Sequence, residues 1–162
     1  MANFTLHDGQ FVPRNLTALL NRSLKISPVV VLQGARQTGK STLVQTLEVN
    51  DKPIRYVSLD EAPVLAAATR DPVSFVASVT STLVIDEVQR VPDLFLAIKT
   101  EVDRNRQPGR FLLTGSANAL MLPRIADSLA GRVQILTLRP FSQDEIALRQ
   151  SSFIDALFDR AN

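Results

Sequence analysis

The chain has no cysteine, and its 162 residues include a single histidine, His7. Without cysteine it forms neither disulfides nor metal sites built from thiolates, an absence that is compatible with a reducing compartment. A single histidine disfavours both a histidine-based catalytic triad and a multi-histidine zinc site. Because His7 lies in a polar N-terminal stretch, we expect it to be solvated rather than functional.

Long apolar runs are also absent from the sequence. The N-terminus has neither the basic region nor the apolar core of a signal peptide. The longest apolar runs have the length of a strand, far below the ~20 residues that are required to span a bilayer. We therefore expect a cytoplasmic protein without a membrane partner. Apolar residues still make up 45% of the chain, which is enough for one domain with a core of its own.

The net charge is only +2, but the basic residues are 14 arginines and 4 lysines. Arginine favours bidentate contacts with phosphates and carboxylates, so this composition is compatible with the binding of a nucleotide or a nucleic acid. The basic residues are scattered along the chain and form no basic run. A nucleic-acid partner is therefore only weakly supported.

Residues Gly34–Ser41 read G-A-R-Q-T-G-K-S, which matches the P-loop pattern G-x-x-x-x-G-K-S. The β-branched apolar run at residues 28–32 precedes the motif and predicts a buried strand. The residues that follow place Leu43, Val44 and Leu47 on one helical face. The motif therefore stands where a P-loop needs it, between a strand and the start of a helix.

This loop predicts how phosphates would be bound. We expect Gly34 and Gly39 to allow positive φ angles and a close approach of the backbone to an anion. Successive N–H groups and the dipole of the following helix then point at the phosphates. Lys40 is expected to reach the β- and γ-phosphates, and the Ser41 hydroxyl to ligate Mg²⁺. The expected nucleotide contacts come from Gly34, Ala35, Arg36, Gln37, Thr38, Gly39, Lys40, Ser41 and Thr42, with the side chain of Arg36 facing solvent or a partner.

An apolar run at residues 82–85 leads directly into Asp86 and Glu87, the pattern of a Walker B motif. The strand would fix Asp86 beside the P-loop, where it holds Mg²⁺ through water alongside Ser41. Glu87 would project toward the γ-phosphate and orient or deprotonate an attacking water. A solvated acidic turn gives the same letters, but a position about 45 residues after a P-loop favours the functional interpretation.

Two further segments contain candidates for catalysis. The strand expected at residues 110–114 ends in Thr114, with Ser116 close behind, and either hydroxyl is placed to contact the γ-phosphate or the water. The alternative for Thr114 is an ordinary strand end. Arg132 precedes another strand, and an arginine delivered to the γ-phosphate in cis or in trans stabilises the charge of the transition state. A surface arginine is the equally weighted alternative for Arg132.

Strand and helix patterns alternate along the chain. Strands are predicted at residues 28–32, 53–58, 82–85, 110–114 and 133–136. Helices are predicted at residues 14–25, 41–48, 62–69 and 117–130, and after Asp71, Pro92 and Ser142. The alternation predicts an α/β protein with a three-layer P-loop NTPase fold and a five-stranded, mainly parallel sheet. In such folds the ligand lies beyond the carboxyl ends of the strands, where we expect all these polar motifs.

Three local details accompany these elements. In the helix after Asp71, we expect Val73, Phe75 and Val76 to pack inward. Gly131 is expected to end the helix at residues 117–130. The sequence from Ser142 to Glu145 has the form of a capping box at the start of the last helix.

Four segments together resemble one family: Gly34–Ser41, Asp86–Gln89, Gly109–Ser116 and Ser128–Arg132. They are similar to the AAA-type ATP-binding domain of prokaryotic ATPases that carry a separate C-terminal domain of unknown function. The resemblance implies ATP and Mg²⁺ as cofactors and ATP hydrolysis as the activity. It also implies self-assembly into a homo-oligomer in which an arginine acts across an interface.

The resemblance suggests a division of the chain. We expect a lead-in at residues 1–13, the ATPase domain at residues 14–150, and a C-terminal helix at residues 151–162. Proteins of this family usually continue further, so the chain is expected to be either a fragment or a natural short form. The C-terminal helix then begins a further domain, and the work that ATP hydrolysis drives lies with an unknown protein partner or that domain.

Two other functions stay open at this point. One is an ATP-binding switch that regulates a partner without efficient turnover. The other is a P-loop small-molecule kinase, although the paired acids Asp86 and Glu87 favour water as the acceptor. A GTPase is disfavoured because the chain has no N-K-x-D motif to read guanine.

Overall fold

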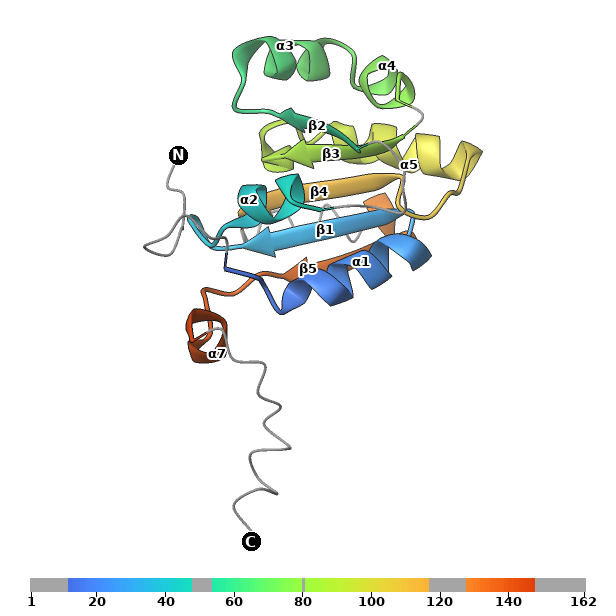
Figure 1. The fold of residues 1–162 in the computed structure, drawn as a ribbon. Helices are drawn as coiled ribbons and strands as arrows, with labels where there is room; N and C mark the ends of the chain where they lie inside the picture. The colour runs from blue at the N-terminus through green and yellow to red at the C-terminus, as the bar shows by residue number, and fades with distance from the viewer. Residues whose placement is uncertain (1–11, 48–53, 80, 117–127, 148–162) are drawn as a thin grey trace, which may run out of the picture.

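The computed structural model describes residues 12–47, 54–79, 81–116 and 128–147 (Figure 1). These residues form one parallel five-stranded sheet with helices on both faces. The strands are β1 (Val29–Gly34), β2 (Ile54–Ser58), β3 (Thr82–Asp86), β4 (Phe111–Ser116) and β5 (Val133–Thr137). The helices are α1 (Leu16–Ile26), α2 (Lys40–Gln45), α3 (Ala62–Arg70), α4 (Pro72–Ala77), the 3₁₀-helix η1 (Val88–Arg90), α5 (Leu94–Arg104) and α7 (Gln143–Ile146). The predicted fold class is confirmed.

The strand order is β2-β3-β4-β1-β5. Strand β4 therefore lies between β1, which leads into the phosphate loop, and β3, which ends at Asp86. Because all neighbours are parallel, the carboxyl ends of the strands meet at one edge of the sheet. The register pairs Gly34 at the end of β1 with Ser116 at the end of β4.

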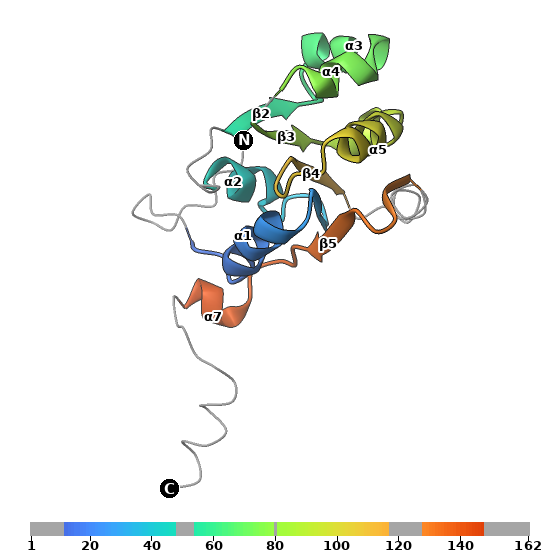
Figure 2. The same ribbon diagram turned by 90° about the vertical axis from the view of Figure 1, so that its right-hand side faces the viewer.

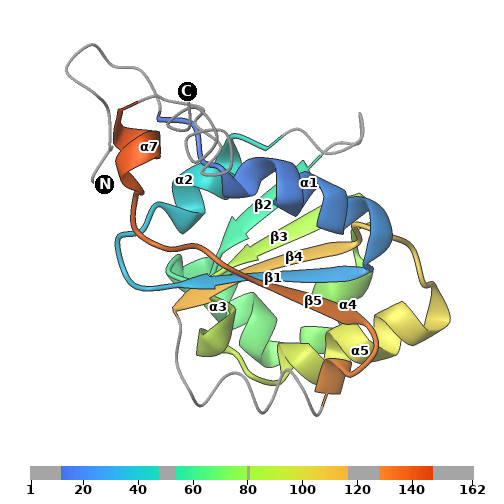
Figure 3. The same ribbon diagram turned by 90° about the horizontal axis from the view of Figure 1, so that it is seen from below.

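The two faces of the sheet carry separate parts of the core. Alternate residues of β1 point to opposite faces, so Val29 and Val31 belong to one cluster and Val30 and Leu32 to the other. The first cluster packs beneath α3, α4 and α5, and the second beneath α1 and α2. Figures 2 and 3 show these two helical layers on either side of the sheet. Residues buried on both faces explain why the strands read as continuous apolar runs.

Local sequence signals set several helix ends. The Asp71 side chain accepts a hydrogen bond from the Ser74 N–H at 2.9 Å, and Pro72 takes the first helical position of α4. The capping box of α7 is also confirmed, since Ser142 and Glu145 bond each other's backbone N–H. Gly131 has φ +71°, as expected at a helix end. Most of the helix predicted at residues 117–130, and the helix predicted at 151–162, lie outside the described residues.

One prediction for α4 is wrong. Val76 is buried and Phe75 is half-buried, but the Val73 side chain is 50% exposed. The side of this short helix that carries Phe75 and Val76 packs against α5, and Val73 lies on the side that faces solvent.

None of the helices in the described part of the chain is long and apolar enough to cross a membrane.

The core packing of α5 gives a test of the fold. Ile98 is fully buried in the cluster beneath α5, whereas Leu96 of the same helix is 64% exposed. We expect Ile98→Ala to lower the free energy of unfolding by about 2–5 kcal/mol, because it leaves a cavity in the core. The matched variant Leu96→Ala should change it by less than about 0.5 kcal/mol. Urea denaturation followed by circular dichroism measures both, and equal losses would contradict this packing.

Candidate functional site

The carboxyl ends of the strands surround a cavity of about 1040 Å³. The phosphate loop and α2 form one wall, and β2, β3, β4 and η1 with their following loops form the others. The lining residues are Arg36, Gln37, Gly39, Lys40, Ser41, Thr42, Gln45, Tyr56, Ser58, Asp60, Glu61, Asp86, Glu87, Gln89, Arg90 and Ser116. The fold thus brings the G-x-x-x-x-G-K-S segment and the paired acids, which are far apart in sequence, into one cavity.

The phosphate loop, residues 34–41, has two residues with positive φ. Gly39 has φ +88°, as the sequence predicts, and the second is Gln37 with φ +62° rather than Gly34. Gly34 is required for a different reason. A Cβ atom at this position would lie 2.4 Å from the carbonyl oxygen of Leu138, just after β5. The expectation of a positive φ at Gly34 is therefore wrong, and close packing against a neighbouring backbone explains this glycine.

Three residues of the predicted nucleotide-contacting set do not line the cavity: Gly34, Ala35 and Thr38. They hold the shape of the loop instead. The Thr38 hydroxyl donates to the Ala35 carbonyl at 3.0 Å, and Lys40 Nζ donates to the carbonyls of Gly34 at 3.1 Å and Ala35 at 2.8 Å. Arg36 is exposed and lines the cavity.

Lys40 carries a buried positive charge on the wall of the cavity. Lys40 is only 6% exposed, and this burial lowers the pKa of its ammonium group. The nearby carboxylates of Glu87 and Asp86 oppose this shift. Lys40, Glu87 and Asp86 therefore interact electrostatically across the cavity, and their charges partly balance.

Asp86 is buried at the end of β3 and is held by two hydroxyl groups. Tyr56 donates to Asp86 Oδ2 at 2.7 Å, and Thr114 donates to Asp86 Oδ1. The Thr114 oxygen also accepts a hydrogen bond from the Glu87 N–H at 3.3 Å. Burial and the hydrogen bond to Asp86 raise the pKa of Tyr56 to about 12. Tyr56 therefore keeps its proton and donates a hydrogen bond to Asp86, which helps to fix the orientation of that side chain.

The two hydroxyl candidates on β4 occupy different surroundings. Thr114 is fully buried behind Asp86 and Glu87, whereas Ser116 lines the cavity. The structure therefore brings Thr114 to the paired acids and Ser116 to the cavity wall. A contact of Thr114 with phosphate stays a prediction.

Glu87 has an unusual backbone conformation for its residue type, with φ +58°. Its carboxylate accepts a hydrogen bond from Gln89 Nε2, which also lies 3.3 Å from the Ser116 hydroxyl. At the rim of the cavity, Arg90 forms an exposed ion pair with Asp60. The turn after β3 thus aims Glu87 into the cavity and gives its carboxylate a neighbouring amide.

Arg132 does not reach this cavity within one chain. Its carbonyl accepts from the Val29 N–H at 3.2 Å, which places it at the start of β1 and β5, at the opposite edge of the sheet. The guanidinium is bound to Asp103 at 2.6 Å and to the Ala130 carbonyl at 2.8 Å. The expectation that every polar motif lies at the carboxyl edge is therefore wrong for Arg132, and a role in trans stays a prediction.

The oxygen ligands expected for Mg²⁺ are available in the cavity. The Ser41 hydroxyl and the carboxylates of Asp86 and Glu87 all line it. Mg²⁺ prefers hard oxygen ligands and keeps several of its waters, so a site with few protein ligands suits it. The residues present therefore fit the metal ion that the loop pattern implies.

Sequence reasoning missed Tyr56, Gln89 and the buried pair Arg14–Glu145. Tyr56 is the only tyrosine of the chain and lies on the strand next to β3, a signal that was available only once the strand order was known. Gln89 lies two residues after Glu87, and its contact depends on the positive φ of Glu87. Arg14 contacts the phosphate loop from the segment before α1, and no local sequence signal places that segment beside the loop.

This parallel order, with the glycine loop at the end of β1 and two acids at the end of β3, defines a P-loop NTPase fold. A family model described as an AAA domain matches residues 27–147. The chain belongs to this AAA domain family.

The chain is also similar to two other proteins in sequence and to a solved structure in fold. Proteins Rv2008c of Mycobacterium tuberculosis and Mb2031c of Mycobacterium bovis, both titled uncharacterized, are each 36% identical over 147 residues. The alignments cover 91% of this chain but 32% of each relative, so the chain spans about a third of their length. The fold is similar to that of the Walker-type ATPase of Pyrococcus abyssi, with a TM-score of 0.54, 16% identity, and coverage of 98% of this chain and 61% of that one.

The pKa of Tyr56 tests the geometry around Asp86. In the folded protein we expect the tyrosinate absorbance to rise near pH 12, against about 10 in the unfolded chain. Since the folded pKa is the higher one, the contribution of Tyr56 to stability is complete below pH ~10 and is lost as the pH rises through about 12. Asp86→Asn should lower the pKa, because it removes a charged acceptor. A folded wild-type protein that titrates near pH 10, with circular dichroism recorded in parallel, would refute the contact.

Proposed function

We propose that this domain binds ATP together with Mg²⁺ and hydrolyses it. The observation that carries the proposal is that Lys40, Ser41, Asp86 and Glu87 line one cavity. A lysine for the β- and γ-phosphates, a hydroxyl and a carboxylate for Mg²⁺, and a second carboxylate for water are the groups that phosphoryl transfer to water requires. Membership of the AAA domain family supports the same activity.

In this proposal each group has one task. Lys40 lies in the loop that surrounds the phosphates and neutralises their charge. Asp86, oriented by Tyr56 and Thr114, and Ser41 would hold Mg²⁺, which would supply positive charge to the phosphates when bound. Glu87 accepts the proton of the attacking water, and its carboxylate faces the same cavity.

A second cavity supports a nucleotide rather than a simple phosphate as the ligand. It has a volume of about 310 Å³ and shares Gly39 and Thr42 with the larger cavity. Its walls include the apolar side chains of Val12, Leu43 and Phe141. A ligand whose phosphates lie on the loop could place a planar base here, because apolar walls with few polar groups suit such a ring.

A second candidate function is an ATP-dependent switch with little turnover. The hydrogen bond from Gln89 to the Glu87 carboxylate favours it, since the same carboxylate must be free to take a proton from water. In either case we propose that ATP is coupled to the remodelling or regulation of an unknown protein partner or of a further domain.

The lysine tests ATP binding. Lys40→Ala should weaken the binding of MgATP at least about tenfold, because a charge-assisted contact with phosphate is lost. Lys25→Ala, at an exposed position near the end of α1, is the matched control and should bind as the wild type does. Isothermal titration calorimetry measures both affinities. Equal affinities of Lys40→Ala and wild type would contradict the proposed phosphate site.

The acid after β3 tests hydrolysis. Glu87→Gln should retain MgATP binding and lower the turnover rate by roughly 10²–10⁴-fold, because the amide cannot accept a proton from water. Phosphate release is measured for both proteins over a range of protein concentrations. Similar rates would exclude Glu87 as the base, and tight binding without turnover in the wild type would favour the switch.

Arg132 tests action across an interface. Arg132→Ala and Glu87→Gln, each inactive alone, should regain part of the activity when mixed if Arg132 acts on the nucleotide of a neighbouring copy. Asp103→Asn is the control, because it removes the partner of Arg132 and leaves the arginine in place. If the mixture stays inactive although Arg132→Ala still assembles, the arginine has no such role.

A further inference from the structure

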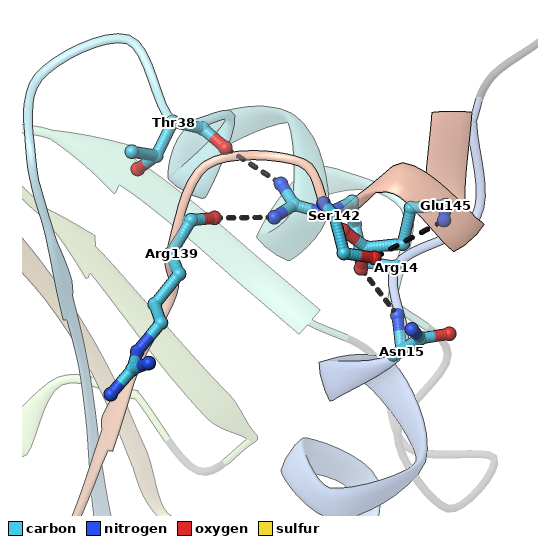
Figure 4. Close-up of polar contacts among 6 residues, drawn as sticks. All are labelled: Arg14, Asn15, Thr38, Arg139, Ser142 and Glu145. Carbon is cyan, nitrogen blue, oxygen red and sulfur yellow. Dashed lines mark hydrogen bonds and ion pairs between the residues drawn. The ribbon is translucent and has the colours of Figure 1, made fainter. Parts of the chain in front are cut away.

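Arg14 joins three parts of the chain that are far apart in sequence. It precedes α1, and its guanidinium donates to the Glu145 carboxylate at 3.2 Å, to the Thr38 carbonyl at 2.7 Å and to the Arg139 carbonyl at 2.6 Å (Figure 4). Its guanidinium also lies 4.1 Å from the centre of the Phe141 ring. Thr38 belongs to the phosphate loop, Arg139 and Phe141 lie between β5 and α7, and Glu145 lies in α7.

Glu145 fixes the arginine in this position. Its Oε1 accepts from Arg14 and from the Asn15 N–H, at 2.8 Å for the latter, and its Oε2 accepts from the Ser142 N–H at 2.9 Å. The side chains of Arg14 and Glu145 are only 7% and 6% exposed. Burial raises the pKa of Glu145, but the hydrogen bonds from Ser142, Asn15 and Arg14 outweigh it and hold the pKa below its usual value. The carboxylate is therefore ionised and has little freedom to turn away.

Arg14 contacts the phosphate loop where the backbone adopts a conformation that is unfavourable for most residues. Thr38 lies between Gln37 and Gly39, and both neighbours have positive φ. A positive φ costs free energy in a residue with a side chain, so the local sequence does not itself favour this conformation at Gln37. Inside the loop, the Thr38 hydroxyl bonds the Ala35 carbonyl. From outside, Arg14 bonds the carbonyl of Thr38 and fixes the orientation of that peptide group.

We propose that Arg14 is a positioning residue for the phosphate loop, held by Glu145, and that it couples the loop to the α7 segment. This inference rests on the proposed function, since it takes the loop to bind phosphates. Arg14 sets the direction of the Thr38–Gly39 peptide and so prepares the adjoining backbone for an anion. Coupling is reciprocal, so a bound nucleotide also tightens the Arg14–Glu145 contact and orders the residues around α7.

The chain offers a matched control for Arg14. Arg110 is likewise buried, pairs with Glu101 at 3.3 Å, bonds the Ser81 carbonyl at 2.9 Å and stacks on Phe111. It precedes β4 and therefore lies at the edge of the sheet opposite the phosphate loop. Lysine at either position keeps the positive charge but lacks the planar fork of donors that holds several acceptors at once. Arg14→Lys and Arg110→Lys thus remove similar contacts at opposite edges.

The experiment measures the affinity of the purified chain for MgATP and for inorganic tripolyphosphate, which has no base. We expect Arg14→Lys to weaken both about tenfold, the loss of one charge-assisted hydrogen bond, and Arg110→Lys to change neither by more than about twofold. Glu145→Gln provides a second variant should Arg14→Lys fold poorly, and it should weaken both ligands in the same way. Hydrogen exchange should show that MgATP protects residues 142–145 in the wild type and not in Arg14→Lys.

Each outcome has a distinct meaning. Arg14 also lines the smaller cavity. Weakening of MgATP binding alone, with tripolyphosphate binding unaffected, therefore overturns the proposal and gives Arg14 a role in binding the base. Equal effects of Arg14→Lys and Arg110→Lys overturn it in favour of a general contribution to stability. If Lys40→Ala loses binding while Arg14→Lys and Glu145→Gln bind as the wild type does, the positioning role fails and the proposed function stands. If the wild type binds neither ligand, both are overturned.

Discussion

The parallel alignment of β1, β4 and β3 is the constraint on which the whole site depends. Each strand delivers its polar residues at or just past its carboxyl end, so the phosphate loop, Ser116 and the acids reach one edge of the sheet. The placement of β4 between the other two has a further effect. It sets Thr114 beside Asp86, where one hydroxyl both donates to the carboxylate and accepts from the next N–H. The order of the strands thus determines the orientation of the acids as well as their position.

Charged side chains are buried at the carboxyl edge of the sheet. Lys40 and Asp86 are both largely removed from solvent, which costs free energy unless each finds a partner. Asp86 has two hydroxyl donors, and Lys40 has two backbone carbonyls and the nearby carboxylates. None of these partners is a full countercharge in direct contact. The arrangement therefore leaves the ammonium of Lys40 and the carboxyl group of Asp86 without a directly bound countercharge, beside the cavity where a ligand with phosphates and a metal ion would lie.

Much of this could be predicted from the sequence, because the signals are local. The strands are continuous apolar runs, and the loop, the acids and the α7 capping box are short motifs whose chemistry requires fixed spacing. What escaped prediction depends on contacts across the fold. Gly34 is needed because of the backbone at Leu138, and Tyr56 meets Asp86 only because β2 lies beside β3. Arg132 precedes β5, so in a parallel sheet it lies at the amino edge, opposite the cavity. This placement follows from the sheet topology and not from the local sequence around Arg132.

The Arg14–Glu145 contact shows the same limit in its strongest form. Its two residues are separated by nearly the whole described chain, and each has a complete local explanation, one before a helix and the other in a capping box. Their meeting adds a property that neither local role contains. The phosphate loop, which bends through a positive φ at Gln37, is held by a residue that is itself held by α7. In our proposal, a change in the position of α7 therefore reaches the loop through two buried side chains, because the guanidinium of Arg14 contacts both Glu145 and Thr38.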